Sequence, residues 1–462
     1  MKLQFLGAVG EVTGSCYLLT IGTHKVLIEC GLVQGNREHE AANDAPFPFD
    51  PDEIDAVVLT HAHLDHSGRL PLLVKRGYDG PVYTHNATAD LARIMLKDAA
   101  FLNEREAEWA NRKLRKSGDD PILPLYDRED AIAAVHSLVP LDYDTAHELL
   151  PGVTLRLFDA GHILGSAIVC LDLQEQGVRR RLVISGDLGH RGAPILRDPV
   201  RLPEADLVLM ESTYGNRLHR SWDSTWQEMG DIILGARKGR GNILIPSFAV
   251  GRTQELLYTF KQHFEEWELA AWDIFLDSPM AIEATEVYAR HPQVYDREAR
   301  HVQQSSGSLY DLPNLHMTRE TEESMALNRV HAGAIIIAGS GMCTGGRIRH
   351  HLRHNLHHRD SHVLIVGFQA AGTPGRALVD GARQIRLAGR ELQVQAQVHT
   401  IGGLSAHADQ QGLFDWYAAF HNRPPLVLVH GEPDASEALK ERISAELNAN
   451  VRLPSLLETV DL

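Results

Sequence analysis

The sequence predicts an α/β protein that is built from more than one domain. Short apolar runs end repeatedly at glycine or at polar turn residues, which is typical of buried β-strands. In the second half of the chain these runs alternate with helix-forming segments, and this order indicates parallel strands covered by helices. The chain has 462 residues, more than one hydrophobic core usually holds, so we expect at least two domains.

Composition narrows the class of protein. A net charge of −16 argues against a surface that coats nucleic acid indiscriminately, although a local basic groove remains compatible with it. The four cysteines form no CxxC pair and are typical of small buried residues in a reducing compartment. There is no apolar stretch of about 18 residues. Met1–Ala8 lacks the layout of a signal peptide, so we expect a cytoplasmic protein that does not bind membranes.

The N-terminal segment is predicted to form three strands. Lys2–Leu6 comes first, and Ser15–Thr20 and Lys25–Ile28 form a hairpin around a glycine-containing turn. Farther along, Asp90–Lys116 has the composition of a long helix. Its basic end, Arg112–Lys116, is either a solvated helix face or a contact for a phosphate backbone, and the residues do not decide between the two.

Four potential metal ligands follow a short apolar run. Ala56–Thr60 is predicted to be a buried strand too short for a helix, and His61, His63, Asp65 and His66 come after it. We expect all four on a loop that turns the first pair toward one ion and the second pair toward another. Imidazole nitrogens with a carboxylate suit zinc, and manganese or iron is also compatible. The chain contains 26 histidines, so stray pairs are expected, but HxHxDH at a strand end is far rarer.

Three further polar residues stand at predicted strand ends. His162 lies between glycines, Asp187 follows Arg181–Ser185, and Glu211 follows Asp206–Met210. Each is weak evidence alone, because an isolated histidine is more often structural and a glutamate at a strand end is often a helix cap. Together they are stronger evidence, because all three follow the His61 motif in order along the chain.

The segment from Asn216 to Arg376 contains four strand-then-turn units, which imply a small parallel sheet with helices on its faces. Ligands of such sheets collect at the carboxyl ends of the strands, and glycine-rich turns there expose N–H groups to phosphate. Tight strand–helix turns need glycine and serine in any case, so both interpretations stay open. The predicted strands are Asn242–Ile245, Ile274–Leu276, Ala334–Ala338 and Val363–Val366. The substrate-binding candidates are Ser247, Arg252, Ser340, Gly341 and Arg376.

The last part of the chain carries two more histidine motifs. Leu392–Val398 alternates as a strand, and SAHAD with His407 follows it. An amphipathic helix around Leu413–Phe420 leads to the apolar strand Leu426–Val429, and VHGE with His430 comes next.

In this order the motifs resemble those of the metallo-β-lactamase fold superfamily, and of its β-CASP branch in particular. The matching pieces are HAHLDHSG, GHILGS, GDLG, EST, SAHAD and VHGE, and they extend over nearly the whole chain. The resemblance implies an αββα sandwich made of residues 1–215 and 377–462. Residues 216–376 would form the inserted α/β domain of mainly parallel sheet, the β-CASP domain.

The resemblance also implies two zinc ions per chain, with manganese or iron possible. The first ion would be bound by His61, His63, His162 and Asp187. The second ion would be bound by Asp65, His66, Asp187 and His430.

Three residues are implied to be catalytic, namely Asp65, which is also a ligand, Glu211 and His407. His407 would lie near Glu211 and act as a general acid, a role suited to a histidine tuned by a carboxylate. Glu29 stands where the family usually has an aspartate, and would orient a metal-bound histidine by accepting its second N–H.

The function implied is hydrolysis of single-stranded RNA with metal-activated water. The resemblance is to bacterial β-CASP ribonucleases and to the endonuclease subunit of the pre-mRNA cleavage and polyadenylation factor. A DNA nuclease of the repair branch typically lacks a histidine in the last motif, so His430 favours RNA. A small-molecule metallohydrolase would not need residues 216–376, and an inactive subunit would have lost ligands. Single-stranded RNA is the expected partner, a homodimer is compatible, and the mode of cleavage, internal or from an end, stays open.

Overall fold

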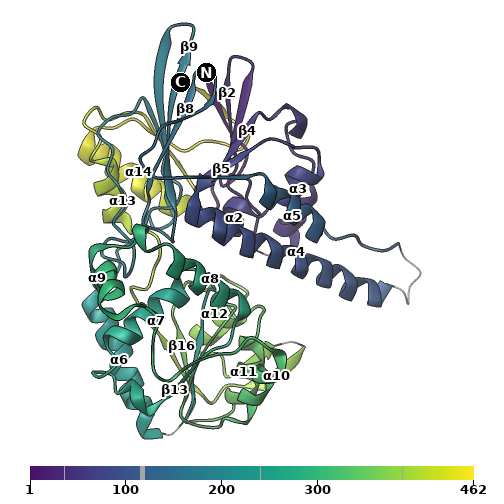
Figure 1. Ribbon diagram of the computed structural model, residues 1–462, viewed down its shortest axis with the longest axis vertical. Helices are drawn as coiled ribbons and strands as arrows, with labels where there is room; N and C mark the ends of the chain where they lie inside the picture. The colour runs from purple at the N-terminus through teal and green to yellow at the C-terminus, as the bar shows by residue number, and fades with distance from the viewer. Residues whose placement is uncertain (36, 115–119, 240, 388) are drawn as a thin grey trace. The chain divides into compact units, whose positions relative to one another are not determined.

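The computed structural model describes residues 1–35, 37–114, 120–239, 241–387 and 389–462 (Figure 1). It divides into two compact units. Unit 1 contains Met1–Arg191, Asp198–Leu218 and His407–Leu462, and unit 2 contains Gly192–Arg197 and His219–Ala406. The last two residues of the predicted helix and of its basic end, Arg115 and Lys116, lie outside the described residues.

Unit 1 contains two seven-stranded sheets. The first has the order β22 (Thr459–Asp461), β1 (Lys2–Phe5), β2 (Tyr17–Ile21), β3 (His24–Ile28), β4 (Ala56–Val58), β5 (Val82–His85), β6 (Leu138–Leu141). The second has the order β21 (Val451–Arg452), β20 (Leu426–Val429), β11 (Leu207–Glu211), β10 (Val178–Ile184), β9 (Ala167–Glu175), β8 (Val153–Asp159), β7 (His147–Leu150). The helices of unit 1 are α1 (Arg37–Glu40), α2 (Leu64–Ser67), α3 (Leu70–Lys75), α4 (Asn86–Leu114), α5 (Arg128–His136), α13 (Gln410–Tyr417) and α14 (Pro433–Leu447).

The two sheets pack against each other because alternate residues of a strand point to opposite faces. In β9, Val169 and Leu171 belong to the core that both sheets share, whereas Ile168 and Cys170 belong to a second core. Trp416 and its neighbours in α13 and α14 cover that second core. On the other side α4 contacts β5 and β6, and Figure 1 shows both sheets between these two groups of helices. The predicted αββα sandwich is confirmed.

Unit 2 is built on a six-stranded sheet in which every neighbouring pair is parallel. Its order is β14 (Leu315–Met317), β13 (Asp273–Leu276), β15 (Ala334–Ala338), β12 (Ile243–Pro246), β16 (His362–Ile365), β19 (Gln397–Thr400). A separate hairpin joins β17 (Gln384–Leu387) to β18 (Arg390–Gln393). The helices are α6 (Trp222–Gly239), α7 (Arg252–Gln262), α8 (Pro279–Arg290), α9 (Arg297–Ser306), α10 (Thr321–Ala326), α11 (Ile348–Asn355) and α12 (Pro374–Val379). The four predicted strands are β12, β13, β15 and β16, so the expected parallel sheet is confirmed.

The second unit extends farther than the expected end at Arg376. β19 pairs in parallel with β16, with Gln397 opposite His362, and this pairing keeps the chain in unit 2 as far as Ala406. The single strand expected at Leu392–Val398 is wrong. β18 ends at Gln393, and the N–H groups of residues 395 and 396 donate to the carbonyl of Leu356.

Two expectations from composition can be compared with the structure. Among the described residues, no helix has both the length and the apolar character needed to cross a membrane. All four cysteines have free thiols and are buried, as expected of small core residues.

Candidate metal centre

Four of the expected ligands come from the segment after β4. His61 and His63 lie in the loop that follows the strand, but Asp65 and His66 lie in the single helical turn of α2. The expectation that all four stand on a loop is therefore wrong for the last two. The N–H groups of His66 and Ser67 both donate to the His63 carbonyl, so the local backbone bonds close a helical turn directly after His63.

The other expected residues lie at the ends of strands in the second sheet. His162 follows β8, Asp187 follows β10, Glu211 ends β11, and His430 follows β20. Strands β10, β11 and β20 are parallel neighbours, so their carboxyl ends meet at one edge of the sheet. All four side chains are buried, none with more than 3% of its surface exposed. His430 has a φ of 48°, a left-handed conformation that is uncommon for residues other than glycine.

Asp187 separates the histidines into two groups. Its Oδ2 atom lies 3.4 Å from His61 Nε2 and 3.5 Å from His162 Nε2. Its Oδ1 atom lies 3.3 Å from His66 Nε2 and 3.7 Å from His430 Nδ1. One carboxylate therefore faces two sets of imidazoles, one through each oxygen.

Among the described residues, the possible ligand atoms form four groups, each with its atoms no more than 4.8 Å apart. Two of these groups contain expected ligands alone, and the other two add Glu29 or Glu211. The first cluster contains His61, His63, His162 and Asp187, and the second contains Asp65, His66 and His430. In the first, His63 Nδ1 lies 3.1 Å from His61 Nε2 and 3.2 Å from His162 Nε2. In the second, the Nε2 atoms of His66 and His430 are 3.2 Å apart. Asp187 Oδ1 lies beside the second cluster, 3.3 Å from His66 Nε2, and the assignment of these residues as the ligands of two ions stays a prediction.

This crowding of nitrogens fits a bound cation in each cluster. Tetrahedral zinc with bonds of about 2.0–2.1 Å separates its nitrogen ligands by about 3.3 Å, close to the observed spacing. Asp187 Oδ1 is buried and has no hydrogen-bond partner among the residues that the structure describes. An unpaired buried acceptor costs about 1–3 kcal/mol, which a cation would offset. The donor atoms, imidazole nitrogen and carboxylate oxygen, are those that zinc binds.

Glu29 lies beside the candidate ligand His66. Its Oε2 atom lies 2.6 Å from His66 Nδ1, and its Oε1 atom accepts the Thr60 N–H at 2.6 Å. Glutamate is one methylene longer than the usual aspartate, and a φ of 65° at Glu29 accompanies this contact. The carboxylate holds Nδ1 of His66 and so leaves Nε2 directed into the second cluster.

Two threonines that sequence reasoning missed hold other rings. Thr60 Oγ1 lies 3.0 Å from His61 Nδ1, and Thr213 Oγ1 lies 3.1 Å from His430 Nδ1. Thr60 directly precedes His61 and Thr213 closes the EST motif, so their places beside the motifs were the available signal. Hydroxyls at the second ring nitrogen fix the orientation of the imidazole.

Electrostatics keeps three of these side chains in metal-binding protonation states. Burial lowers the pKa of His61 well below its ordinary value, and the neighbouring His66 lowers it further, so this ring is neutral. Burial raises the pKa of Asp187, but the surrounding imidazoles, His430 first, bring it well below its ordinary value. The pKa of Asp65 falls to about 2, because His66 and His430 outweigh the effect of burial. Neutral rings and ionised carboxylates are the forms that bind metals. His66 differs: burial lowers its pKa, but Asp187, Glu29 and Asp65 raise it well above its ordinary value, so a cation at its Nε2 has to displace a proton.

His407 lies beside the two clusters and, among the described residues, belongs to neither. Its Nδ1 atom is 3.2 Å from both carboxylate oxygens of Glu211 and 3.9 Å from Asp187 Oδ2. Glu211 Oε1 in turn accepts the Leu188 N–H at 2.6 Å. Burial lowers the pKa of His407, but the carboxylates of Glu211 and Asp187 more than offset this and raise it to about 9. The ring therefore carries a proton at neutral pH.

Three family models match successive parts of this chain. Residues 9–229 match the family model described as the metallo-β-lactamase superfamily, and residues 253–378 match the Beta-Casp domain. Residues 391–454 match the model described as a Zn-dependent metallo-hydrolase RNA specificity domain. A ribonuclease of Thermus thermophilus is 41% identical over 95% of this chain and 95% of its own length. The chain belongs to the β-CASP family of the metallo-β-lactamase superfamily.

A more distant relative and one solved structure also match this chain over its whole length. The transcription termination factor FttA of Pyrococcus abyssi is 32% identical and covers 100% of this chain with 71% of its own. A crystal structure of a protein of unknown function from Enterococcus faecalis has a TM-score of 0.55 at 12% identity, and covers 100% of this chain and 99% of its own. That likeness shows the shared fold alone. The resemblance stated from the motifs is confirmed, and with it the assignment as a metal-dependent hydrolase of this family.

Two of the five expected substrate contacts are interior residues of unit 2. Ser247 is 2% exposed, and its hydroxyl bonds to Thr253 Oγ1 at 3.0 Å. Arg252 is 7% exposed and forms an ion pair with Glu255, one turn along the same helix. The Ser247 hydroxyl and the Arg252 guanidinium are therefore both bonded to other residues of unit 2.

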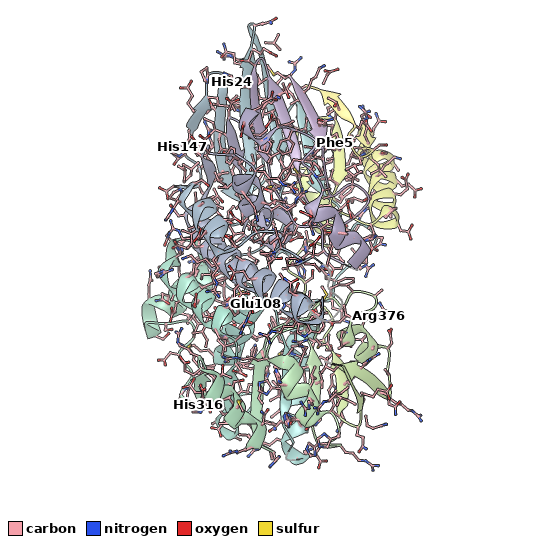
Figure 2. All side chains as sticks on the ribbon, turned by 90° about the vertical axis from the view of Figure 1, so that its right-hand side faces the viewer. Phe5, His24, Glu108, His147, His316 and Arg376 are labelled. Carbon is pink, nitrogen blue, oxygen red and sulfur yellow. The ribbon has the colours of Figure 1, made fainter. Side chains whose placement is uncertain are left out.

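The other three expected contacts follow β15 and β16. Ser340 Oγ accepts the Gly345 N–H at 3.0 Å, and this closes the turn after β15. Gly341 belongs to the same turn and is buried. Arg376 is at the surface of unit 2, where its side chain is labelled in Figure 2, and its Nε lies 2.8 Å from Asp380 Oδ1.

Proposed function

We propose that this β-CASP protein is an RNA-processing nuclease that hydrolyses phosphodiester bonds of single-stranded RNA with two zinc ions. The observation that carries the proposal is Asp187, whose two oxygens face two separate sets of imidazoles. Support for RNA as the substrate comes from the relative named a ribonuclease and from the RNA specificity domain matched at residues 391–454. Zinc is favoured by the ligand types, and manganese or iron would be bound by the same atoms.

In this proposal each residue has a stated role. Two ions in the clusters would supply an activated water at neutral pH and neutralise charge on the scissile phosphate. Glu29, Thr60 and Thr213 hold imidazoles in the orientation that directs ring nitrogens into the clusters. Asp65 completes the second cluster through its contact with His430, 3.4 Å away.

The proton for the leaving oxygen comes from His407. Glu211 accepts from its Nδ1 and stabilises the charged ring, and the Leu188 N–H fixes Glu211 in turn. A protonated imidazole held in this way can give its proton to the oxygen that departs from phosphorus. Glu211 is therefore a positioning residue and His407 the catalytic acid.

A substrate panel tests the proposal. Zinc-loaded protein would be incubated with end-labelled single-stranded RNA, duplex DNA and a β-lactam, with His63→Ala protein as the matched control. We expect cleavage of the RNA by the wild type alone. Cleavage of duplex DNA in preference to RNA would show that DNA, and not RNA, is the substrate. Hydrolysis of the β-lactam only would overturn the nuclease assignment.

Two further expectations stay predictions. A homodimer is tested by light scattering of the zinc-loaded protein. A cytoplasmic location is tested by fractionation of the native cells.

A further inference from the structure

Two phenylalanine side chains are exposed at one edge of the sheet in unit 2. Phe248 is 42% exposed and follows β12, and Phe368 is 50% exposed and follows β16. Strands β12 and β16 are parallel neighbours, so both rings lie at the carboxyl ends of adjacent strands. Single exposed apolar side chains are common, but two at the ligand-binding edge of a parallel sheet indicate a binding surface.

The ring of Phe248 lies against the backbone of two neighbouring turns. A Cβ atom at Gly341 would come within 2.7 Å of Cδ2 of this ring, and one at Gly367 within 3.7 Å of Cε2. The turn after β15 contributes Gly341 and the turn after β16 contributes Gly367. Any side chain at Gly341 would displace the ring, so this glycine is what lets Phe248 adopt its position.

A buried amide ties these turns into one surface. Gln369 is 6% exposed, and its Nε2 donates to the carbonyls of Gly341, Gly367 and Phe368 at 2.9, 3.1 and 2.9 Å. The second aromatic residue is therefore fixed relative to the glycine on which the first one rests. Such a connection holds an aromatic pair in place without burying it.

Helix α12, which carries Arg376, is hydrogen-bonded to the turn after β15, but the guanidinium of Arg376 is paired with Asp380. The N–H of Gly375 donates to the carbonyl of Met342 at 3.2 Å, and Met342 directly follows Gly341. Arg376 comes next in the chain, with its side chain 48% exposed. We call the set Phe248, Gly341, Gly367 and Phe368 the aromatic platform.

We propose that the aromatic platform stacks unpaired bases of single-stranded RNA. Binding of single strands without sequence preference relies on aromatic side chains on which successive bases stack, and the platform presents two such rings. A duplex offers no free base faces along its length, so the platform would make binding selective for single strands. The proposal rests on the proposed function, because it requires RNA as the substrate.

Binding measurements with a base-free strand test the proposal. Fluorescence anisotropy would compare single-stranded RNA with an oligonucleotide of the same length that carries abasic ribose throughout, using zinc-loaded protein in the slow His407→Ala background. We expect Phe248→Ala to weaken RNA binding by about 5- to 150-fold, the range for loss of one stacked base. Binding of the abasic strand should stay unchanged, and Phe248→Trp should restore RNA binding.

Controls keep the outcomes distinct. Phe368→Ala should behave like Phe248→Ala, whereas Met325→Ala, which removes another exposed apolar side chain of unit 2, should not alter binding. Equal losses for RNA and abasic strand, or RNA binding unaffected by both phenylalanine variants, would overturn the platform. A parent protein that binds single-stranded RNA no better than duplex DNA would instead contradict the proposed function, so the two failures are distinguishable.

Discussion

Replacing His407 with alanine should separate catalysis from metal binding. His407 Nδ1 contacts both oxygens of Glu211 at 3.2 Å, and the ring belongs to neither ligand cluster among the described residues. General acids typically contribute about 10²–10⁴-fold to rate, equal to about 2.7–5.5 kcal/mol of transition-state stabilisation. We therefore expect His407→Ala to slow RNA cleavage within that range and to retain both ions.

Glu211→Gln provides the comparison that the geometry suggests. This variant keeps the His407 ring but removes the carboxylate charge that stabilises the protonated form of that ring. We therefore expect a smaller loss of cleavage rate, about 10–100-fold, the usual effect of removing such a partner. Because both residues serve one proton transfer, the double variant should be no slower than His407→Ala alone.

The assay is single-turnover cleavage of 5′-labelled single-stranded RNA with enzyme in excess, alongside elemental analysis of each protein. Single turnover removes product release from the measured rate. Loss of metal from the His407→Ala protein would make His407 a ligand and refute the assignment. A double variant whose loss equals the product of the two single losses would show that the residues act independently.

Three other outcomes are expected. His63→Ala should lower the metal content directly, since His63 Nδ1 lies 3.1 and 3.2 Å from two other ligand nitrogens, and elemental analysis measures this. Asp277→Ala should destabilise unit 2 by about 3–5 kcal/mol in urea denaturation. The reason is that buried His351 and half-buried Arg347 lose the carboxylate that lies 2.5 and 2.8 Å from them. An unchanged midpoint of unfolding would contradict this. Although burial raises the pKa of Asp277, hydrogen bonds from His351 and three other groups bring it well below its ordinary value. The stability that Asp277 confers is therefore present above about pH 4 and lost as pH falls below it, so the difference between wild type and variant should shrink in acid.

The residues that converge in the two clusters could be singled out from the sequence because their signal is local. Each ligand stands at the end of an apolar run, and parallel strands bring such ends to one edge of a sheet. Asp187 illustrates this: a GDLG turn after β10 fixes both its burial and its direction. The short helical turn that holds Asp65 and His66 was missed, because a four-residue helix has no periodicity to detect.

Features set by long-range contacts escaped sequence reasoning. β19 is half exposed and has little apolar patterning, so its pairing with β16, and with it the extent of unit 2, could not be foreseen. The charge of Arg252 suggested a phosphate contact, but burial beside Glu255 depends on how α7 packs in unit 2. The exposed ring of Phe248 was likewise invisible, because apolar residues in a sequence are presumed to be buried.

Anomalous diffraction at the zinc edge, from crystals of the zinc-loaded protein, tests the central claim most directly. We predict two peaks per chain on either side of Asp187, one among His61, His63 and His162, and the other bounded by His66 and His430. No peak at these side chains, or a single peak in only one cluster at full loading, would contradict the claim that distant segments of this chain hold a pair of cations.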